Sequence, residues 1–88
     1  MSQDQAAVRW DRGALARHFG DPNDQQGSVN DPRSHCEQGV EWNEKWLYRN
    51  PKHEGWDRMV LWSRYDLLGV WRVGSDGSVM PEELPAQP

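Results

Sequence analysis

The sequence predicts an α+β fold, namely a small antiparallel β-meander of three to four strands with one short N-terminal helix and a long polar loop. Within residues 40–80, apolar side chains recur at every second position, which is typical of strands with one buried face. Turn signals rich in glycine, proline and asparagine divide this segment into strand-sized pieces. We therefore expect one domain, in which residues 1–39 form the helix and loop, residues 40–80 the meander and residues 81–88 an extended tail.

The first expected element is a helix over about residues 11–19. Asp11 can cap its N-terminus, and Gly20 provides a stop at its C-terminus. Leu15 and Phe19 lie four positions apart, so they share one face of the helix. Because a helix this short is marginal alone, we expect it to dock on the sheet through these two side chains.

Residues 21–39 contain almost no apolar side chain that could anchor them to a core. Loops of this length without secondary structure are usually disordered, functional or ordered only against a partner. The sequence therefore predicts a flexible polar loop that becomes ordered when a partner binds.

The first strand of the meander is expected at residues 40–48. Its apolar face is formed by alternate residues, namely Val40, Trp42, Trp46 and Tyr48. A helix over residues 42–48 remains an alternative, because Trp42 and Trp46 are also four positions apart and the nearby glutamate, lysine and leucine residues favour helices.

The second strand, over residues 56–65, is expected at the centre of the sheet because it is apolar on both sides. One side carries Trp56, Val60 and Trp62, and the other carries Met59, Leu61 and Tyr65. If the helix covers one of these sides, the other remains open and is where we expect the functional surface.

Turn residues place the remaining strands. A turn over residues 50–55 contains a proline that fixes φ and a glycine that permits a left-handed residue. A third strand is expected at residues 67–73, and the glycine-rich hairpin turn 74–77 leads to a short fourth strand at residues 78–80.

Composition and charge exclude several classes of protein. The one cysteine, Cys36, permits no internal disulfide and fits a reducing, cytoplasmic setting. The sequence shows neither a signal peptide nor the roughly 20 apolar residues that cross a bilayer. The net charge of -4 arises at the two ends of the chain, and residues 40–74 are close to neutral. We therefore expect a protein that is not inserted in a membrane and does not bind duplex nucleic acid.

Tryptophan is the most informative residue type, with six copies in 88 residues. A small sheet with one short helix can cover only one of its faces, so some rings should stay exposed and mark a binding surface. The opposite interpretation is that most rings simply build the core of a small protein. Arginines alternate with the rings, as in interface anchors. The candidate binding residues are Trp46, Trp56, Arg58, Trp62, Arg64 and Trp71.

Motifs for catalysis or metal binding are weak. His35 and Cys36 are adjacent, and such a pair cannot easily face one zinc ion. No motif supports Cys36 as a nucleophile. Glu41 and Glu44, and also Glu82 and Glu83, show no partner pattern that would support acid or base chemistry, so we expect all four to be solvated. The sequence therefore predicts no catalytic residues, no metal site and no cofactor.

These observations favour a small non-catalytic accessory protein that binds a larger protein, or a second copy of itself, through an aromatic sheet face. One alternative is a ligand-binding module that stacks a sugar, a nucleobase or a cofactor on exposed tryptophan. A third hypothesis is a cysteine-dependent enzyme that uses Cys36.

Overall fold

The computed structural model describes residues 10–86 of the chain. The first nine residues of the expected N-terminal segment and the last two of the expected tail lie outside this range. The described elements are one helix and seven strands, namely α1 (Arg12–Phe19), β1 (Asp24–Gly27), β2 (His35–Glu37), β3 (Val40–Trp42), β4 (Glu44–Tyr48), β5 (Trp56–Ser63), β6 (Asp66–Gly74) and β7 (Val79–Pro81).

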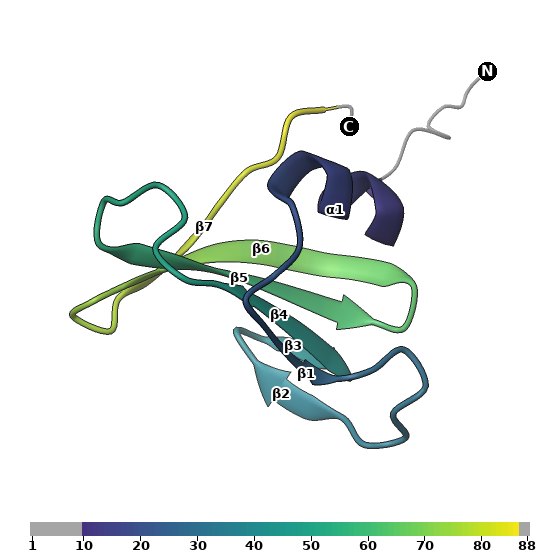
Figure 1. Ribbon diagram of the computed structural model, residues 1–88. Coiled ribbons are helices and arrows are strands. Elements are labelled where there is room, and N and C mark those ends of the chain that lie inside the picture. The colour runs from purple at the N-terminus through teal and green to yellow at the C-terminus, as the bar shows by residue number, and fades with distance from the viewer. Residues whose placement is uncertain (1–9, 87–88) are drawn as a thin grey trace.

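The strands form two antiparallel sheets (Figure 1). The larger sheet has five strands in the order β1-β4-β5-β6-β7, and β2 and β3 form a separate hairpin. The α+β class, the antiparallel pairing and the single short helix are confirmed, but the expected number of three to four strands is too low. In the described part of the chain, no helix is long and apolar enough to cross a membrane.

Helix α1 begins and ends where its sequence signals indicate. The side chain of Asp11 accepts a hydrogen bond from the Ala14 amide at 2.8 Å, which caps the N-terminus. Gly20 follows the last turn with φ of 83°, a value that favours glycine. Leu15 is fully buried beneath the helix, and Phe19 packs against the same core. The helix therefore docks through the two predicted side chains.

Strand β5 is the centre of the larger sheet, as its two-sided apolar pattern predicts, but it ends at Ser63. Tyr65, expected on one of its apolar sides, lies beyond the strand and is 70% exposed. Strand β5 pairs with β4 on one edge and with β6 on the other. Alternate residues point to opposite sides of the sheet, which gives it two distinct faces. The helix face carries Trp46, Tyr48, Val60, Trp62 and Val70, and α1 packs on it. The open face carries Leu47, Met59, Leu61, Trp71 and Val73.

The predicted strand at residues 40–48 is two strands that break at Asn43. Its backbone N–H donates to the Trp62 carbonyl at 3.0 Å, and its buried side chain donates at 3.3 Å each to the carbonyls of Val29 and Asp31. The side-chain oxygen accepts from the Arg64 amide at 2.8 Å. The alternation is interrupted here, because these bonds hold the chain in a bend.

This break corrects the expected face of Trp42. Trp42 packs with Met59 and Leu61 of the open face, whereas Trp46 packs on the helix face. The helical alternative over this segment is wrong, since residues 44–48 pair with both β1 and β5.

The prediction of a loop without structure over residues 21–39 is also wrong in part. This segment contains β1, which pairs with β4, and β2, which pairs with β3. An edge strand needs backbone partners rather than apolar side chains, so polar residues do not prevent it from forming. Side chains add to the pairing, because Arg49 contacts Asp24 at 2.7 Å and Gln25 donates to Glu44 at 3.1 Å.

Residues 82–85, which we call the strap, follow β7 and cross the helix face beside α1. Glu82 pairs with Arg58, Leu84 packs against the core of the helix face, and the Pro85 carbonyl accepts from the Trp10 indole at 2.8 Å. Figure 1 shows both ends of the described chain on the α1 side of the sheet. The helix face is therefore covered by α1 and the strap, and neither end of the described chain crosses the open face.

Candidate functional site

Two of the six predicted binding residues belong to the core. Trp46 is 4% exposed and Trp62 is 0% exposed, and their ring centroids lie 5.0 Å apart beneath α1. Their burial corrects the expectation that these rings are exposed. Helix α1 covers the sheet face that holds them, and neither ring offers a surface to a partner.

Arg58 is buried as well, which the sequence pattern did not reveal. Its Nε and Nη2 atoms donate to the two carboxylate oxygens of Glu82, both at 2.8 Å. Only 11% of the Glu82 side chain is exposed, so the expectation that it is solvated is wrong. The Arg58 guanidinium carbon lies 3.8 Å from the ring centroid of Phe19 and 5.2 Å from that of Trp56. Burial raises the pKa of Glu82, but the hydrogen bonds and charge of Arg58 outweigh it, and the pKa lies below its usual value.

A second buried carboxylate, Glu44, lies at the other end of the helix face. Only 2% of its side chain is exposed, so the expectation that it is solvated is wrong. Its Oε2 atom accepts from Arg12 at 3.0 Å and from the Trp46 indole at 2.8 Å. Its Oε1 atom lies 2.7 Å from Arg12 as an ion pair without an aligned hydrogen bond. Burial raises the pKa of Glu44, but the hydrogen bonds and the charge of these partners lower it by more. The pKa therefore lies below its usual value, and the group stays ionised.

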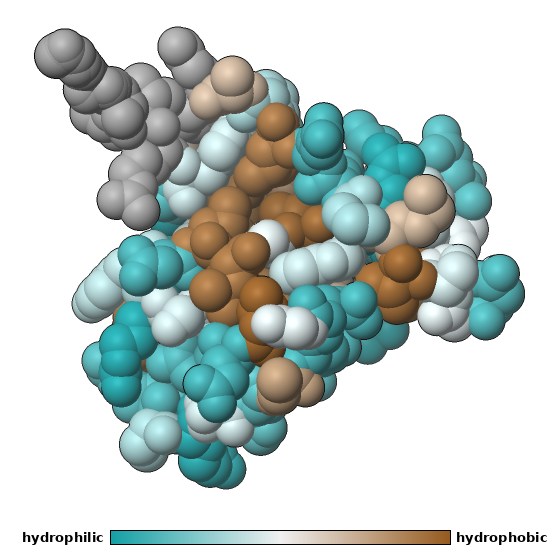
Figure 2. All heavy atoms as spheres, turned by 180° about the vertical axis from the view of Figure 1, so that it is seen from behind, coloured by the Kyte–Doolittle hydropathy of each residue, from teal (hydrophilic) through white to brown (hydrophobic). Residues whose placement is uncertain are grey.

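The open face differs in that its apolar groups are only partly covered. Met59 and Leu61 form its buried floor, and half-buried side chains surround them, namely Val40, Leu47, Leu68, Trp71 and Val73. Figure 2, which views the molecule from behind relative to Figure 1, shows hydrophobic residues gathered near the middle of that view, with polar residues around them. The open face is therefore the first candidate for an interaction site.

Trp71 lies flat on this face because Gly69 has no side chain. A Cβ at Gly69 would stand 2.6 Å from one carbon of the Trp71 ring and 3.0 Å from each of two others. Similar distances to three ring carbons mean that the face of the ring, rather than its edge, covers Gly69. The second face of the indole therefore points away from the sheet, and the residue is half-buried.

The β2–β3 hairpin covers one end of the open face. Trp42 of β3 packs on Met59 and Leu61, and the Lys45 amine lies 4.9 Å from its ring centroid. The His35 ring lies 4.7 Å from the same indole. The hairpin stops there, and the part of the face around Trp71 has no such cover among the described residues.

Both basic side chains at the border of the open face are paired with acidic side chains of the same chain. Lys45 contacts Glu37 at 2.7 Å and Arg49 contacts Asp24 at 2.7 Å. Asp57 accepts a hydrogen bond from the Asn50 amide at 2.8 Å. Shape and apolar contact, rather than charge, should therefore select what binds this face.

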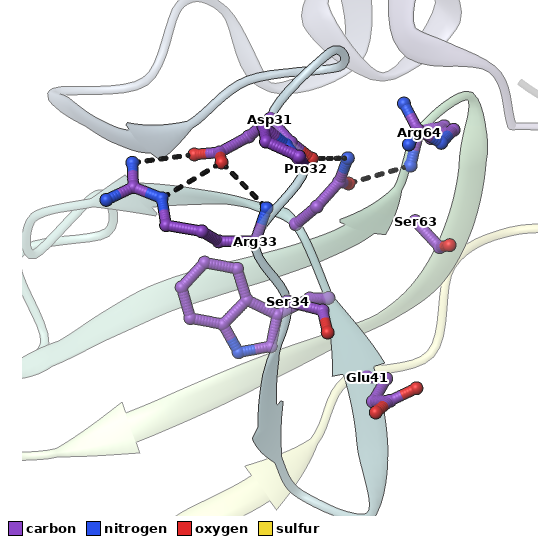
Figure 3. Close-up of a pocket in the computed structure, with 9 residues that line it drawn as sticks. Asp31, Pro32, Arg33, Ser34, Glu41, Ser63 and Arg64 are labelled. Carbon is purple, nitrogen blue, oxygen red and sulfur yellow. Dashed lines mark hydrogen bonds and ion pairs between the residues drawn. The ribbon is translucent and has the colours of Figure 1, made fainter.

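A polar pocket of about 130 Å³ adjoins Trp42 at the hairpin end (Figure 3). Its walls carry Asp31, Arg33, Ser34, Glu41, Ser63 and Arg64. Asp31 holds Arg33 through bonds at 3.0 and 3.1 Å, and Arg64 donates to the Val29 carbonyl at 3.0 Å. Sites for nucleotides or drug-sized ligands occupy roughly 300–1,000 Å³, so this pocket is large enough only for a small group.

Three predicted binding residues remain at the surface, but they do not meet. Trp56 is the first residue of β5 and Arg64 follows its last residue, so the two lie at opposite ends of that strand. Trp71 lies on the open face, while Trp56 lies beside Arg58 and Arg72 at the end of the helix face. Of the six residues, only Trp71 belongs to the open apolar surface.

No family model, curated protein or solved structure matches this chain. Its function must be argued from the two sheet faces themselves.

His35 and Cys36, which the sequence made weak candidates for catalysis or metal binding, do not form a site together. Cys36 is exposed on β2, and His35 beside it stacks on Trp42. Adjacent residues of a strand point to opposite sides, so this thiol and imidazole do not face each other. Among residues 10–86, no group of three or more potential ligands could hold a metal ion.

Proposed function

We propose that this chain is a small non-catalytic interaction protein that binds a larger protein, or a second copy of itself, through the open face of its sheet. The observation that carries this proposal is the one-sided cover of the sheet. The helix and the strap cover one face, while Leu47, Leu68, Trp71 and Val73 are only partly buried on the other. Contiguous apolar surface of this kind marks interaction sites in small proteins.

The form of the surface supports a protein partner. Trp71 supplies a flat, rigid ring near the centre, with aliphatic side chains around it, and interface hot spots are enriched in such central aromatic residues. The border is polar and internally paired, as in the rims of protein interfaces. Because Cys36 is exposed and free, a reducing compartment such as the cytoplasm suits the protein.

Photo-crosslinking in the native cells tests this proposal. A photoreactive amino acid replaces Val73 on the open face, and the matched control carries it at Arg17, on the exposed side of α1. We expect crosslinks to another protein, or to a second copy, from position 73 and none of comparable yield from position 17. Equal yields from both positions, or no adduct from position 73, would contradict the proposal.

A stacking module is the second candidate, and the flat position of Trp71 favours it. One indole face lies on Gly69, and the other can stack on a sugar or a nucleobase. Titration with nucleotides and oligosaccharides should then quench tryptophan fluorescence in the wild-type chain and not in Trp71→Leu. If none of these ligands quenches the emission, this candidate is excluded.

A further inference from the structure

The guanidinium of Arg58 forms a carboxylate-binding site on the helix face. The side chain is 4% exposed, and the rings of Phe19 and Trp56 lie beside it at 3.8 and 5.2 Å. Two parallel N–H bonds of 2.8 Å hold one carboxylate, which is the geometry that guanidinium groups bind best. A cation buried this far from water requires a carboxylate partner.

That carboxylate comes from the strap, which belongs to neither the sheet nor the helix. The Glu82 amide donates to the Val70 carbonyl at 2.8 Å, Leu84 packs on the core, and the next residue, Pro85, accepts the Trp10 bond. Glu83, which lies between Glu82 and Leu84, is exposed. These contacts fit an extended segment of the form Glu-x-Leu whose middle residue is exposed.

We propose that this part of the helix face is a recognition site for extended Glu-x-Leu segments, which the chain's own strap fills in cis and the strap of a second copy fills in trans. An identical strap makes identical contacts, so an exchange between two copies changes the free energy of this interface little. The exchange requires only that the turn at residues 74–78 opens and that β7 leaves together with the strap.

Concentration decides between the cis and trans arrangements. A covalently attached strap acts at an effective concentration of about millimolar, so dilute protein keeps it in cis. Weakening the cis contact makes the site available to a strap in trans. The open face lies on the other side of the sheet and takes no part in this exchange.

A peptide of residues 79–86 tests the site, with the full chain as the receptor. The chain carries Glu82→Gln to weaken its own strap, and the control chain carries Glu83→Gln, which changes the charge equally at an exposed position. We expect the labelled peptide to bind the first chain at least about tenfold more tightly than the control. A peptide that carries Glu82→Gln should lose about tenfold in affinity, and one that carries Glu83→Gln should bind unchanged.

Equal binding of these two altered peptides, or no binding at millimolar peptide, would overturn the proposal. If the Glu82→Gln chain does not fold alone, the unaltered peptide should restore its circular dichroism spectrum, and the peptide that carries Glu82→Gln should not. If the unaltered peptide does not restore the spectrum, the proposed recognition site is also excluded.

Light scattering on a mixture of two variants tests whether a second copy of the chain supplies the strap that binds in trans. Arg58→Gln keeps an intact strap, and Glu82→Gln keeps an intact site. Together they can form one complete pair in trans, so we expect a higher average mass in the mixture than in either separate sample at the same total concentration. A mixture whose average mass equals that of the separate samples at millimolar concentration would overturn the assignment of the second copy.

Discussion

The two faces of the sheet are built from alternate residues of the same strands, yet they differ in where their charged groups lie and in how deeply these are buried. The helix face buries Glu44 and Arg58, and each is paired with an opposite charge. It also buries the Tyr48 hydroxyl, which donates to the Gly20 carbonyl at 2.9 Å, and burial raises the pKa of Tyr48 to about 12. On the open face, charged groups are confined to the border and the centre is apolar.

The helix face is therefore a covered core, whereas the open face is an apolar surface that the described chain covers only in part. Charges can be buried on the helix face because α1 and the strap provide matched partners there. The open face contains little that must be matched, so it can be covered or exposed at modest cost. A surface of that kind suits a partner that binds and leaves.

Truncation of a leucine on each face should give the largest difference. Leu15→Ala removes a fully buried side chain under α1, and we expect the free energy of unfolding to fall by about 2–5 kcal/mol. Leu47→Ala removes a half-buried side chain on the open face, and we expect a loss of about 1 kcal/mol. Urea denaturation of both variants measures the difference, and equal losses would contradict the contrast between the faces.

Acid should weaken the helix face. Glu44 and Glu82 have pKa values below their ordinary 4.5 in the folded chain, so their contribution to stability is present above that pH and is lost as the pH falls below it. We therefore expect the wild-type chain to lose stability between pH 5 and pH 3, and Glu44→Gln to lose less over the same range. Glu83→Gln, at an exposed position, should follow the wild type. Parallel curves for Glu44→Gln and wild type would show that Glu44 is not involved.

Removal of the Asn43 amide should have a smaller effect. Asn43→Ala leaves the Arg64 amide and the carbonyls of Val29 and Asp31 without this partner. We expect a loss of about 1–3 kcal/mol in unfolding free energy and faster amide hydrogen exchange in residues 28–34. Unchanged exchange in that segment would mean that other contacts hold it.

The smallest change in stability, below about 1 kcal/mol, is expected for Gly69→Ala. The new Cβ would stand 2.6 Å from the Trp71 ring, which must swing away from the sheet. The ring is half-buried, so this movement costs little, but it removes the flat surface. We expect a red shift of tryptophan emission and weaker binding through the open face, and unchanged binding would exclude Trp71 as its centre.

Sequence patterns predicted the elements whose signals lie within a few consecutive residues. The cap at Asp11, the stop at Gly20 and the two-sided apolar pattern of β5 each gave the correct element. The hairpin turn before β7 also formed as expected, closed by a bond from the Gly77 amide to the Gly74 carbonyl. Such signals need no knowledge of distant residues.

The features that were missed depend on contacts between distant parts of the chain. Strand β1 is specified by pairing with β4 rather than by its own side chains, and the bend at Asn43 depends on a loop more than ten residues earlier. The burial of Trp46 and Arg58 depends on where α1 and the strap cross the sheet. One signal could have identified Glu44, because it alternates with Trp42 and Trp46 on the predicted apolar face.

Hydroxyl-radical footprinting tests most directly whether a partner covers the open face. Trp71 reports on that face, and the controls are Tyr65 and Met80, which are 70% and 63% exposed. We expect Trp71 in a native cell extract, or in concentrated purified protein, to be oxidised several-fold less than in dilute purified protein, while Tyr65 and Met80 change little. Equal oxidation of Trp71 under all three conditions would contradict the proposal that this face is an interaction surface.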